Sequence, residues 1–191
     1  FGSLSALRQL WITENSLSGT IPSALGNLSQ LTELRLNEND LSGQIPTQLT
    51  QLLNLELLDL AANSLTGSIP SGIGSMTKLT RVYLDRNELS GEIPAGVGQL
   101  SSLTLLELSY QSLAGPIPAS LGQLANLEEL GLSDNLFTGP IPKELAGLKK
   151  LRRLQLENNA LTGTIPPELG QMTALADLRL YGNDLSGTIP K

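Results

Sequence analysis

The chain repeats itself every 24 residues, and this period constrains the fold more than any other feature of the sequence. The stretch LSGTIP begins at Leu17, and related stretches recur at that spacing with glycine and Ile-Pro always in the same places. Leucines mark the same register without insertion or deletion: Leu7, Leu31, Leu55, Leu79, Leu103, Leu127, Leu151 and Leu175. A fixed period of this length indicates a solenoid, in which every turn packs on its neighbours.

Each unit contains a short period-two pattern that predicts a strand. In the first unit Leu10 and Ile12 are apolar and the residues around them vary, so one face of the strand is expected to be buried. Stacking one such strand per turn gives a parallel sheet with strands about 4.8 Å apart. The exposed positions of this sheet are then free to vary.

An asparagine follows each strand at a fixed distance. The set is Asn15, Asn39, Asn63, Asn87, Asn135, Asn159 and Asn183, and the fifth unit has Gln111 instead. Because an amide both donates and accepts, a buried stack of them can satisfy the backbone groups of adjacent turns. At Gln111 we expect a local disturbance of this ladder, with a water or a shifted side chain, but no break.

The Leu-x-Gly-x-Ile-Pro stretch has a physical reading of its own. Gly19 and its equivalents allow a close or positive-φ backbone, and Ile21 and its equivalents bury against the core. Pro22 and its equivalents fix φ and end hydrogen bonding where the chain turns away. The following residues, from Leu25 to Leu28 in the first unit, fit a short irregular or 3₁₀ turn.

Composition and motifs argue against several classes of function. The net charge of −6, without a basic block, argues against a nucleic-acid partner. The sequence has no histidine and no cysteine, which removes the commonest general base, the commonest metal ligands and any disulfide. No phosphate loop or nucleophile motif occurs, and Glu128 and Glu129 should point apart. We therefore predict a non-enzymatic protein without cofactor or metal, and no membrane span within the chain because no long apolar run is present.

The full pattern LxxLxxLxLxxNxLxGxIPxxLGxLxx resembles the plant-type leucine-rich repeat of receptor-like kinase and receptor-like protein ectodomains and of polygalacturonase-inhibiting proteins. The resemblance implies an α/β-type repeat solenoid, a right-handed curved superhelix of 24-residue repeats. It places a parallel β-sheet on the concave face, short 3₁₀ or irregular turns on the convex face, and a second short strand near Leu17 to Thr20. It also implies extracellular or cell-surface use and recognition through the inner sheet.

The register predicts one continuous solenoid domain. Residues 1–6 are expected to be the tail of a truncated preceding repeat, 7–174 seven complete repeats, and 175–191 a truncated eighth. Terminal turns of a solenoid usually carry a polar cap, and the paired-cysteine caps of the plant family are missing here. We interpret the chain as a segment of a longer array; the alternative is a capless protein whose ends meet other subunits.

The exposed strand positions are the candidate ligand surface. They hold four of the six aromatic residues, and aromatics and arginine are enriched in binding hot spots. The densest cluster, on two adjacent turns, is the leading candidate, although solvated polar residues are also ordinary at such positions. The predicted ligand-binding residues are Trp11, Arg35, Asp59, Arg81, Tyr83, Asp85, Arg86, Glu107, Tyr110 and Tyr181.

One glycosylation sequon, Asn27-Leu28-Ser29, lies on a predicted convex loop, so Asn27 is a candidate glycosylation site of a secreted chain. The leading functional hypothesis is a binding module for a protein, peptide or glycan. Two alternatives remain: a structural, self-assembling rod or surface element, and an ice-binding surface. The last would use the hydroxyl row beside each glycine, which Gln44, Glu92, Pro116 and Pro140 interrupt.

Overall fold

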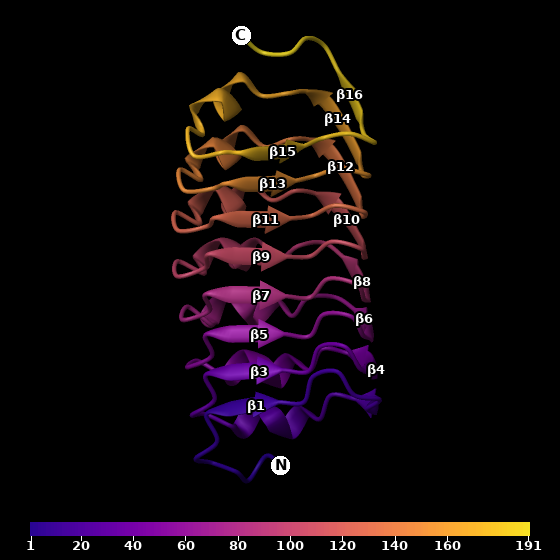
Figure 1. Cartoon of the computed structure of the whole chain (residues 1–191), viewed down its shortest axis with the longest axis vertical. Coiled ribbons are helices and arrows are strands. Elements are labelled where there is room, and N and C mark those ends of the chain that lie inside the picture. The colour runs from indigo at the N-terminus through magenta and orange to yellow at the C-terminus, as the bar shows by residue number, and fades with distance from the viewer.

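The computed structural model describes residues 1–191 and is a solenoid with two parallel eight-stranded sheets (Figure 1). The odd-strand sheet runs β1-β3-β5-β7-β9-β11-β13-β15, and the even-strand sheet follows it along each turn. The strands of the odd-strand sheet are β1 Gln9–Trp11, β3 Glu33–Arg35, β5 Leu57–Asp59, β7 Arg81–Tyr83, β9 Leu105–Glu107, β11 Glu129–Gly131, β13 Arg153–Gln155 and β15 Asp177–Arg179. This arrangement confirms the predicted leucine-rich-repeat solenoid.

The even-strand sheet confirms the second short strand that the family resemblance implied. Its strands are β2 Ser18–Thr20, β4 Asp40–Gln44, β6 Ser64–Gly67, β8 Glu88–Gly91, β10 Ser112–Pro116, β12 Leu136–Pro140, β14 Ala160–Thr164 and β16 Asp184–Ser186. Seven 3₁₀ turns complete the coils: η1 Ser23–Asn27, η2 Thr47–Gln51, η3 Ser71–Ser75, η4 Ala95–Gln99, η5 Ala119–Gln123, η6 Lys143–Gly147 and η7 Pro167–Gln171. None of these helices has the length and apolar character needed to cross a membrane.

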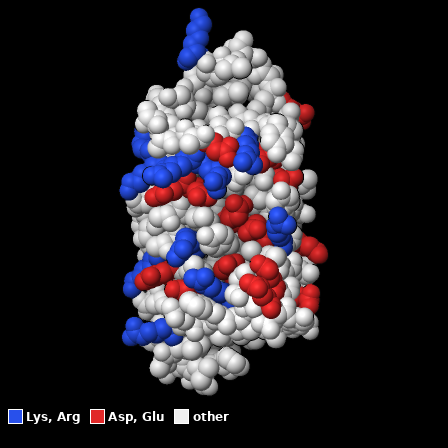
Figure 2. Space-filling view, viewed as in Figure 1, with Lys and Arg blue, Asp and Glu red and all other residues white.

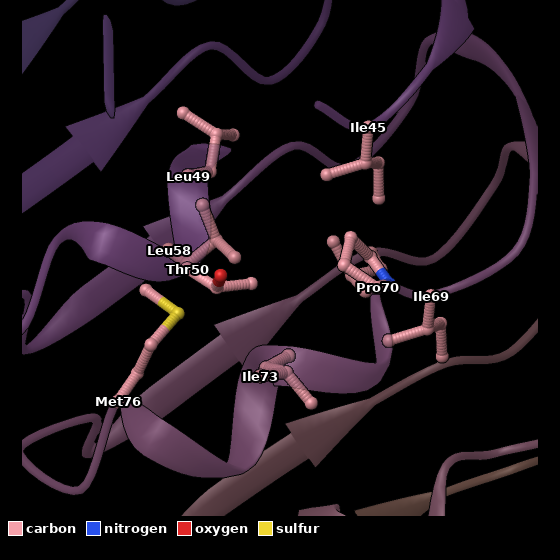
Figure 3. Close-up of a pocket in the computed structure, with 9 residues that line it drawn as sticks. Ile45, Leu49, Thr50, Leu58, Ile69, Pro70, Ile73 and Met76 are labelled. Carbon is pink, nitrogen blue, oxygen red and sulfur yellow. The ribbon is translucent and has the colours of Figure 1, made fainter. Parts of the chain in front are cut away.

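One apolar core of 46 buried residues runs through all the turns. Each strand of the odd-strand sheet pairs in 24-residue register with the next, for example Leu34 with Leu58, so the same position points inward every time. Figure 3 shows part of this interior, where Ile45, Leu58 and Met76 converge from neighbouring turns and leave a gap of only about 10 Å³. Burial therefore fixes the repeat length at 24 residues, because an insertion or deletion of one residue would turn polar side chains into this core.

Glycine and proline act where the sequence predicted them to. All eight glycines of the Leu-x-Gly-x-Ile-Pro stretches have positive φ, between 74° at Gly43 and 85° at Gly19. In the first seven Ile-Pro pairs the proline precedes a 3₁₀ turn, as Pro22 does with φ −66°. The eighth pair departs from the expectation, since Ile189 is exposed and no 3₁₀ turn follows Pro190. Because proline lacks an N–H and fixes φ, it ends the even strand and aims the chain into the turn.

The asparagine ladder is also confirmed. Asn87 shows the arrangement: its Nδ2 donates to the carbonyls of Leu60, Leu84 and Asp85 at 3.0, 2.9 and 3.3 Å, and its Oδ1 accepts the N–H of Leu65 at 2.9 Å. One side chain thus satisfies backbone groups of its own turn and of the preceding one. The bonds lie in the buried interior, where an unmade hydrogen bond is expensive.

Gln111 continues the ladder with fewer bonds. Its Oε1 accepts the N–H of Leu89 at 2.9 Å, and its Nε2 donates to the carbonyl of Leu84. By contrast, Asn135 on the next turn also donates to two carbonyls of its own turn, those of Leu132 and Ser133. The extra methylene carries the amide past its own turn, so the predicted local disturbance is a shifted side chain that leaves the ladder unbroken.

The substitution Gln111→Asn should stabilise the protein. A shorter side chain can restore the two same-turn hydrogen bonds while keeping those to the preceding turn, which is worth about 1 kcal/mol in the free energy of unfolding. Urea denaturation followed by circular dichroism measures the change. As the reciprocal control, Asn87→Gln should destabilise the protein; if both variants move stability in the same direction, the hydrogen-bond explanation is wrong.

Candidate functional site

The last residues of the strands of the odd-strand sheet form one column of side chains on its outer face. Trp11 pairs with Arg35, Arg35 with Asp59, Asp59 with Tyr83, and Tyr83 with Glu107. Side chains on successive strands of a parallel sheet are about 4.8 Å apart, so predicted residues far apart in sequence become neighbours. Acidic and basic side chains are interspersed over this face of the molecule (Figure 2).

Two of the predicted residues sit on strained backbone just after the strands. Arg86 has φ 54° and Tyr110 has φ 57°, in the left-handed region that side-chain-bearing residues rarely adopt. Hydrogen bonds to the next turn hold this conformation: the N–H of Arg86 donates to Ser109 O and that of Tyr110 to Ser133 O, both at 3.0 Å. The same geometry places the Arg86 guanidinium 5.0 Å from the centre of the Tyr110 ring.

A depression of about 360 Å³ lies on this face at the middle and C-terminal turns. It brings together Tyr83, Asp85, Arg86, Glu107, Tyr110 and Tyr181 of the predicted set, with Ser109, Ser133, Gln155, Glu157 and Arg179 completing its lining. Arg81, on the same strand as Tyr83, does not line it, and Trp11, Arg35 and Asp59 lie on earlier turns outside it. We call this feature the tyrosine depression.

Small residues stand in the lining of the depression and directly beneath it. Ser109 and Ser133 line it from two successive turns. Gly131 pairs with Glu107 on one side and with Gln155 on the other, and it contributes no side chain between them. A Cβ at position 131 would lie 2.2 Å from both carboxylate oxygens of Glu107. The absence of a side chain at Gly131 is thus what lets Glu107 lie across the next strand.

Three carboxylates line this hollow, and burial is the largest cause of their pKa shifts. Burial raises the pKa of Asp85, of Glu107 and of Glu157 above the ordinary carboxylic acid value. At Glu107 the hydrogen bond from Ser109 partly opposes this effect, its backbone N–H donating to Oε1 at 3.1 Å. Carboxylates that are hard to ionise favour a positively charged group nearby.

A second group of predicted residues forms at the N-terminal end of the same face. The Arg35 guanidinium lies 4.7 Å from the centre of the Trp11 ring and donates to Glu33 Oε2 from Nε and Nη2 at 3.1 and 2.8 Å. Asp59 follows, its carboxylate accepting the N–H of Ala61 at 3.2 Å, and burial raises its pKa. Arg35 is held by Trp11 and Glu33, and no hollow forms around these residues as it does at the tyrosine depression.

Sequence reasoning missed five of the lining residues. Ser109, Ser133 and Glu157 occupy the same repeat position as Asp85, while Gln155 and Arg179 occupy that of Tyr83. The leading prediction rests on aromatic and charged residues of two adjacent turns, a criterion that these five residues do not meet. Reading each repeat position for small residues beside large ones would have found the hollow, since Gly131 and Ser133 stand between the turns of Tyr110 and Tyr181.

Comparison with known proteins assigns a family. A profile described as a leucine-rich repeat region matches residues 1–134, and a leucine-rich repeat profile matches residues 126–148 and 150–172. No curated protein matches the sequence.

Solved structures include close likenesses. A structure described as a TDR receptor is 35% identical with a TM-score of 0.97, over 99% of this chain and 33% of that one. The Arabidopsis receptor kinase HAESA, solved with the peptide hormone IDA and the co-receptor SERK1, is 39% identical with a TM-score of 0.96, over 99% and 32%. A plant ice-binding protein is 30% identical with a TM-score of 0.75, over 100% and 69%. The chain therefore spans about a third of the length of the two receptor structures.

The substitution Glu107→Gln should change the pH dependence of stability. Because burial raises the pKa of Glu107 in the folded state, the folded protein binds this proton more tightly than the unfolded chain does. The stability that the protonated acid provides is complete below the unfolded pKa, near 4.3, and is lost as pH rises through the folded value. The variant should therefore gain stability over wild type as pH rises.

Urea unfolding of wild type and variant at a series of pH values from acid to neutral measures this difference. The glutamine carbonyl can still accept the N–H of Ser109, so the comparison isolates the charge. A difference between the two proteins that does not vary with pH would contradict the assignment of burial as the cause.

Proposed function

The chain belongs to the leucine-rich repeat family, and we propose that it is a recognition module that binds an extended peptide along its odd-strand sheet, without catalysis. The observation that carries this proposal is the tyrosine depression, an unfilled polar and aromatic hollow on an otherwise regular face. Its tyrosines expose large rings, with Tyr110 51% and Tyr181 63% accessible to solvent. Rings of this kind are the usual anchors of protein interfaces.

The backbone under the depression is suited to binding without rearrangement. Strands, asparagine ladder and left-handed residues are all tied to the adjacent turn by hydrogen bonds, such as that of Tyr110 N to Ser133 O. A rigid platform pays little conformational entropy when a ligand docks, so more of the contact energy appears as affinity. The length of the sheet, with eight strands in register, fits an extended chain better than a compact small molecule.

The structural relatives favour a peptide over a glycan as the ligand. HAESA was solved with a peptide hormone and a co-receptor, and RGFR1, 38% identical with a TM-score of 0.79, with the peptide RGF2. The present chain corresponds to about a third of such ectodomains, so we extend to it only the mode of recognition. Identity of the peptide follows from the residues on this face, which differ from turn to turn.

An ice-binding role has less support, although one structural relative is an ice-binding protein. The hydroxyl row of the even-strand sheet is interrupted, and β10 and β12 each end in a proline, Pro116 and Pro140. Several hydroxyls in that row are also turned to the backbone, as Ser42 Oγ donates to Gly19 O at 3.4 Å. A regular, outward-facing array of hydroxyls is therefore not formed.

We also propose that the chain is extracellular and carries sugar at Asn27. The Asn27 side chain is exposed at the end of η1, opposite in the turn to the odd-strand sheet, so a glycan there leaves the peptide surface open. Expression through a eukaryotic secretory pathway should give a species whose mass falls by one glycan on treatment with an endoglycosidase. Asn27→Gln should secrete without that shift; an enzyme-insensitive wild-type mass would overturn the assignment.

Substitutions that change the lining of the depression should weaken peptide binding. Linear peptides selected from a random phage-displayed library on the wild-type protein provide the probe. Gly131→Leu displaces the Glu107 side chain, which lines the hollow, and Tyr110→Ala removes an exposed anchor, so each should weaken binding about tenfold or more in fluorescence anisotropy.

The matched control is Thr138→Ala, an exposed position on β12 of the even-strand sheet, which should leave the affinity unchanged. Circular dichroism verifies that every variant is folded. Equal affinity of wild type and both depression variants, or failure to select any peptide, would overturn the proposed function.

A further inference from the structure

One carboxylate oxygen of the tyrosine depression is buried without a hydrogen-bond partner. Glu157 is only 4% exposed, and its Oε2 atom is buried and makes no hydrogen bond. Buried polar atoms are normally satisfied, and an ionised carboxylate that is not paired costs several kcal/mol of folding free energy. The depression thus contains an acceptor that no group of this chain uses.

The nearest cation does not fill that role. Arg179 Nη1 lies 3.8 Å from Glu157 Oε1, beyond hydrogen-bonding distance. The guanidinium instead donates to Asp177, from Nε at 3.2 Å and from Nη2 at 2.9 Å. Arg179 is therefore already paired with another acid, and it approaches only the other oxygen of Glu157.

The remaining charges make the hollow acidic. Asp85, Glu107 and Glu157 line it, and neither of its two arginines comes within hydrogen-bonding distance of Asp85 or Glu157. Arg86 is two-thirds exposed, lies over the Tyr110 ring and comes no closer than 3.9 Å to Asp85. The three acids do not form a cluster with the geometry of a metal site. An organic cation therefore fits the hollow better than a metal ion does.

The aromatic lining selects among organic cations. Tyr83 and Tyr181 line the hollow and, unlike Tyr110, have no cation over their rings. A guanidinium is planar, stacks on aromatic faces and donates in parallel to both oxygens of a carboxylate, whereas an ammonium is a compact, strongly hydrated point charge. The last torsion of a glutamate side chain is broad, so Oε2 can turn toward such a donor.

We propose that the tyrosine depression is the pocket for an arginine side chain of the ligand, with Glu157 as its ion-pair partner and Tyr181 as its stacking surface. This inference rests on the proposed function, since it supplies the chemistry of one residue of the bound peptide. It assigns Glu157, which sequence reasoning missed, as the residue that sets specificity at this position.

N-acetyl-arginine amide is the direct probe, and N-acetyl-citrulline amide, which has nearly the same shape but no charge, is its control. Titration into ¹³C-labelled protein, followed by NMR of the glutamate carboxyl and tyrosine ring signals, should shift Glu157 and Tyr181. The arginine probe should bind at least about tenfold more tightly than the citrulline probe, as expected for one charged hydrogen-bonded contact.

Glu157→Gln should lower the affinity for the arginine probe about tenfold. Glu38→Gln makes the same change of charge at an exposed position of the same face, outside the depression, and should leave the affinity unchanged. Equal binding of the two probes, or equal loss of affinity in the two variants, would overturn the assignment of Glu157.

The peptide library separates this inference from the function it rests on. Peptides selected by wild type should be rich in arginine, and Glu157→Gln should capture them poorly. Peptides that depend on Tyr110 but lack arginine and bind Glu157→Gln equally would overturn the arginine pocket and leave the proposed function standing. Binding of the arginine probe with no peptide selected would support the pocket and overturn the peptide function.

Discussion

Every turn of this protein has to satisfy the buried backbone of its neighbour, and the asparagine side chain after each strand does most of that work. Asn87 alone serves four backbone groups on two turns. Those groups lie where the chain leaves the odd-strand sheet and no longer has ladder partners on that side. Because a buried group without a partner costs about 1–3 kcal/mol, the side chain that serves it can hardly change, and neither can its spacing.

That constraint divides the residues into two classes. Positions that touch the next turn are fixed in type, from the inward leucines to the positive-φ glycines. Residues on the outer surface of the odd-strand sheet are not constrained in this way, so the sizes and charges of their side chains differ from turn to turn. Binding specificity in a solenoid of this kind resides in those differences, because the backbone that carries them is nearly the same everywhere. The tyrosine depression is such a difference: Gly131 and two serines stand where other turns carry larger side chains.

The same division explains what could be read from the sequence. Burial, the positive-φ glycines, the 3₁₀ turns and the asparagine ladder were predictable, because each recurs in seven or eight units and a repeated residue type has a single physical reason. Even the shift at Gln111 followed from one extra methylene. The left-handed residues were harder to see. Only Asp134, Asn158 and Gly182 are of the types that favour that conformation, and Arg86 and Tyr110 hide the pattern.

The depression could not be predicted, because it depends on contacts between side chains of different turns, which no single residue of the sequence reveals. Glu107 matters because position 131 has no side chain, and Arg179 is unavailable to Glu157 because Asp177 holds it.

These relations also carry a cost in stability. Four acids with raised pKa on one face, Asp59 and the three of the depression, oppose folding when they ionise, and a protein selected for stability alone would replace at least one of them with an amide. A repetitive core that spans all the turns can tolerate that cost, since its stability is a sum over many equivalent interfaces. Unfavourable burial of acids on the one variable surface is what a binding site built on a rigid scaffold should show.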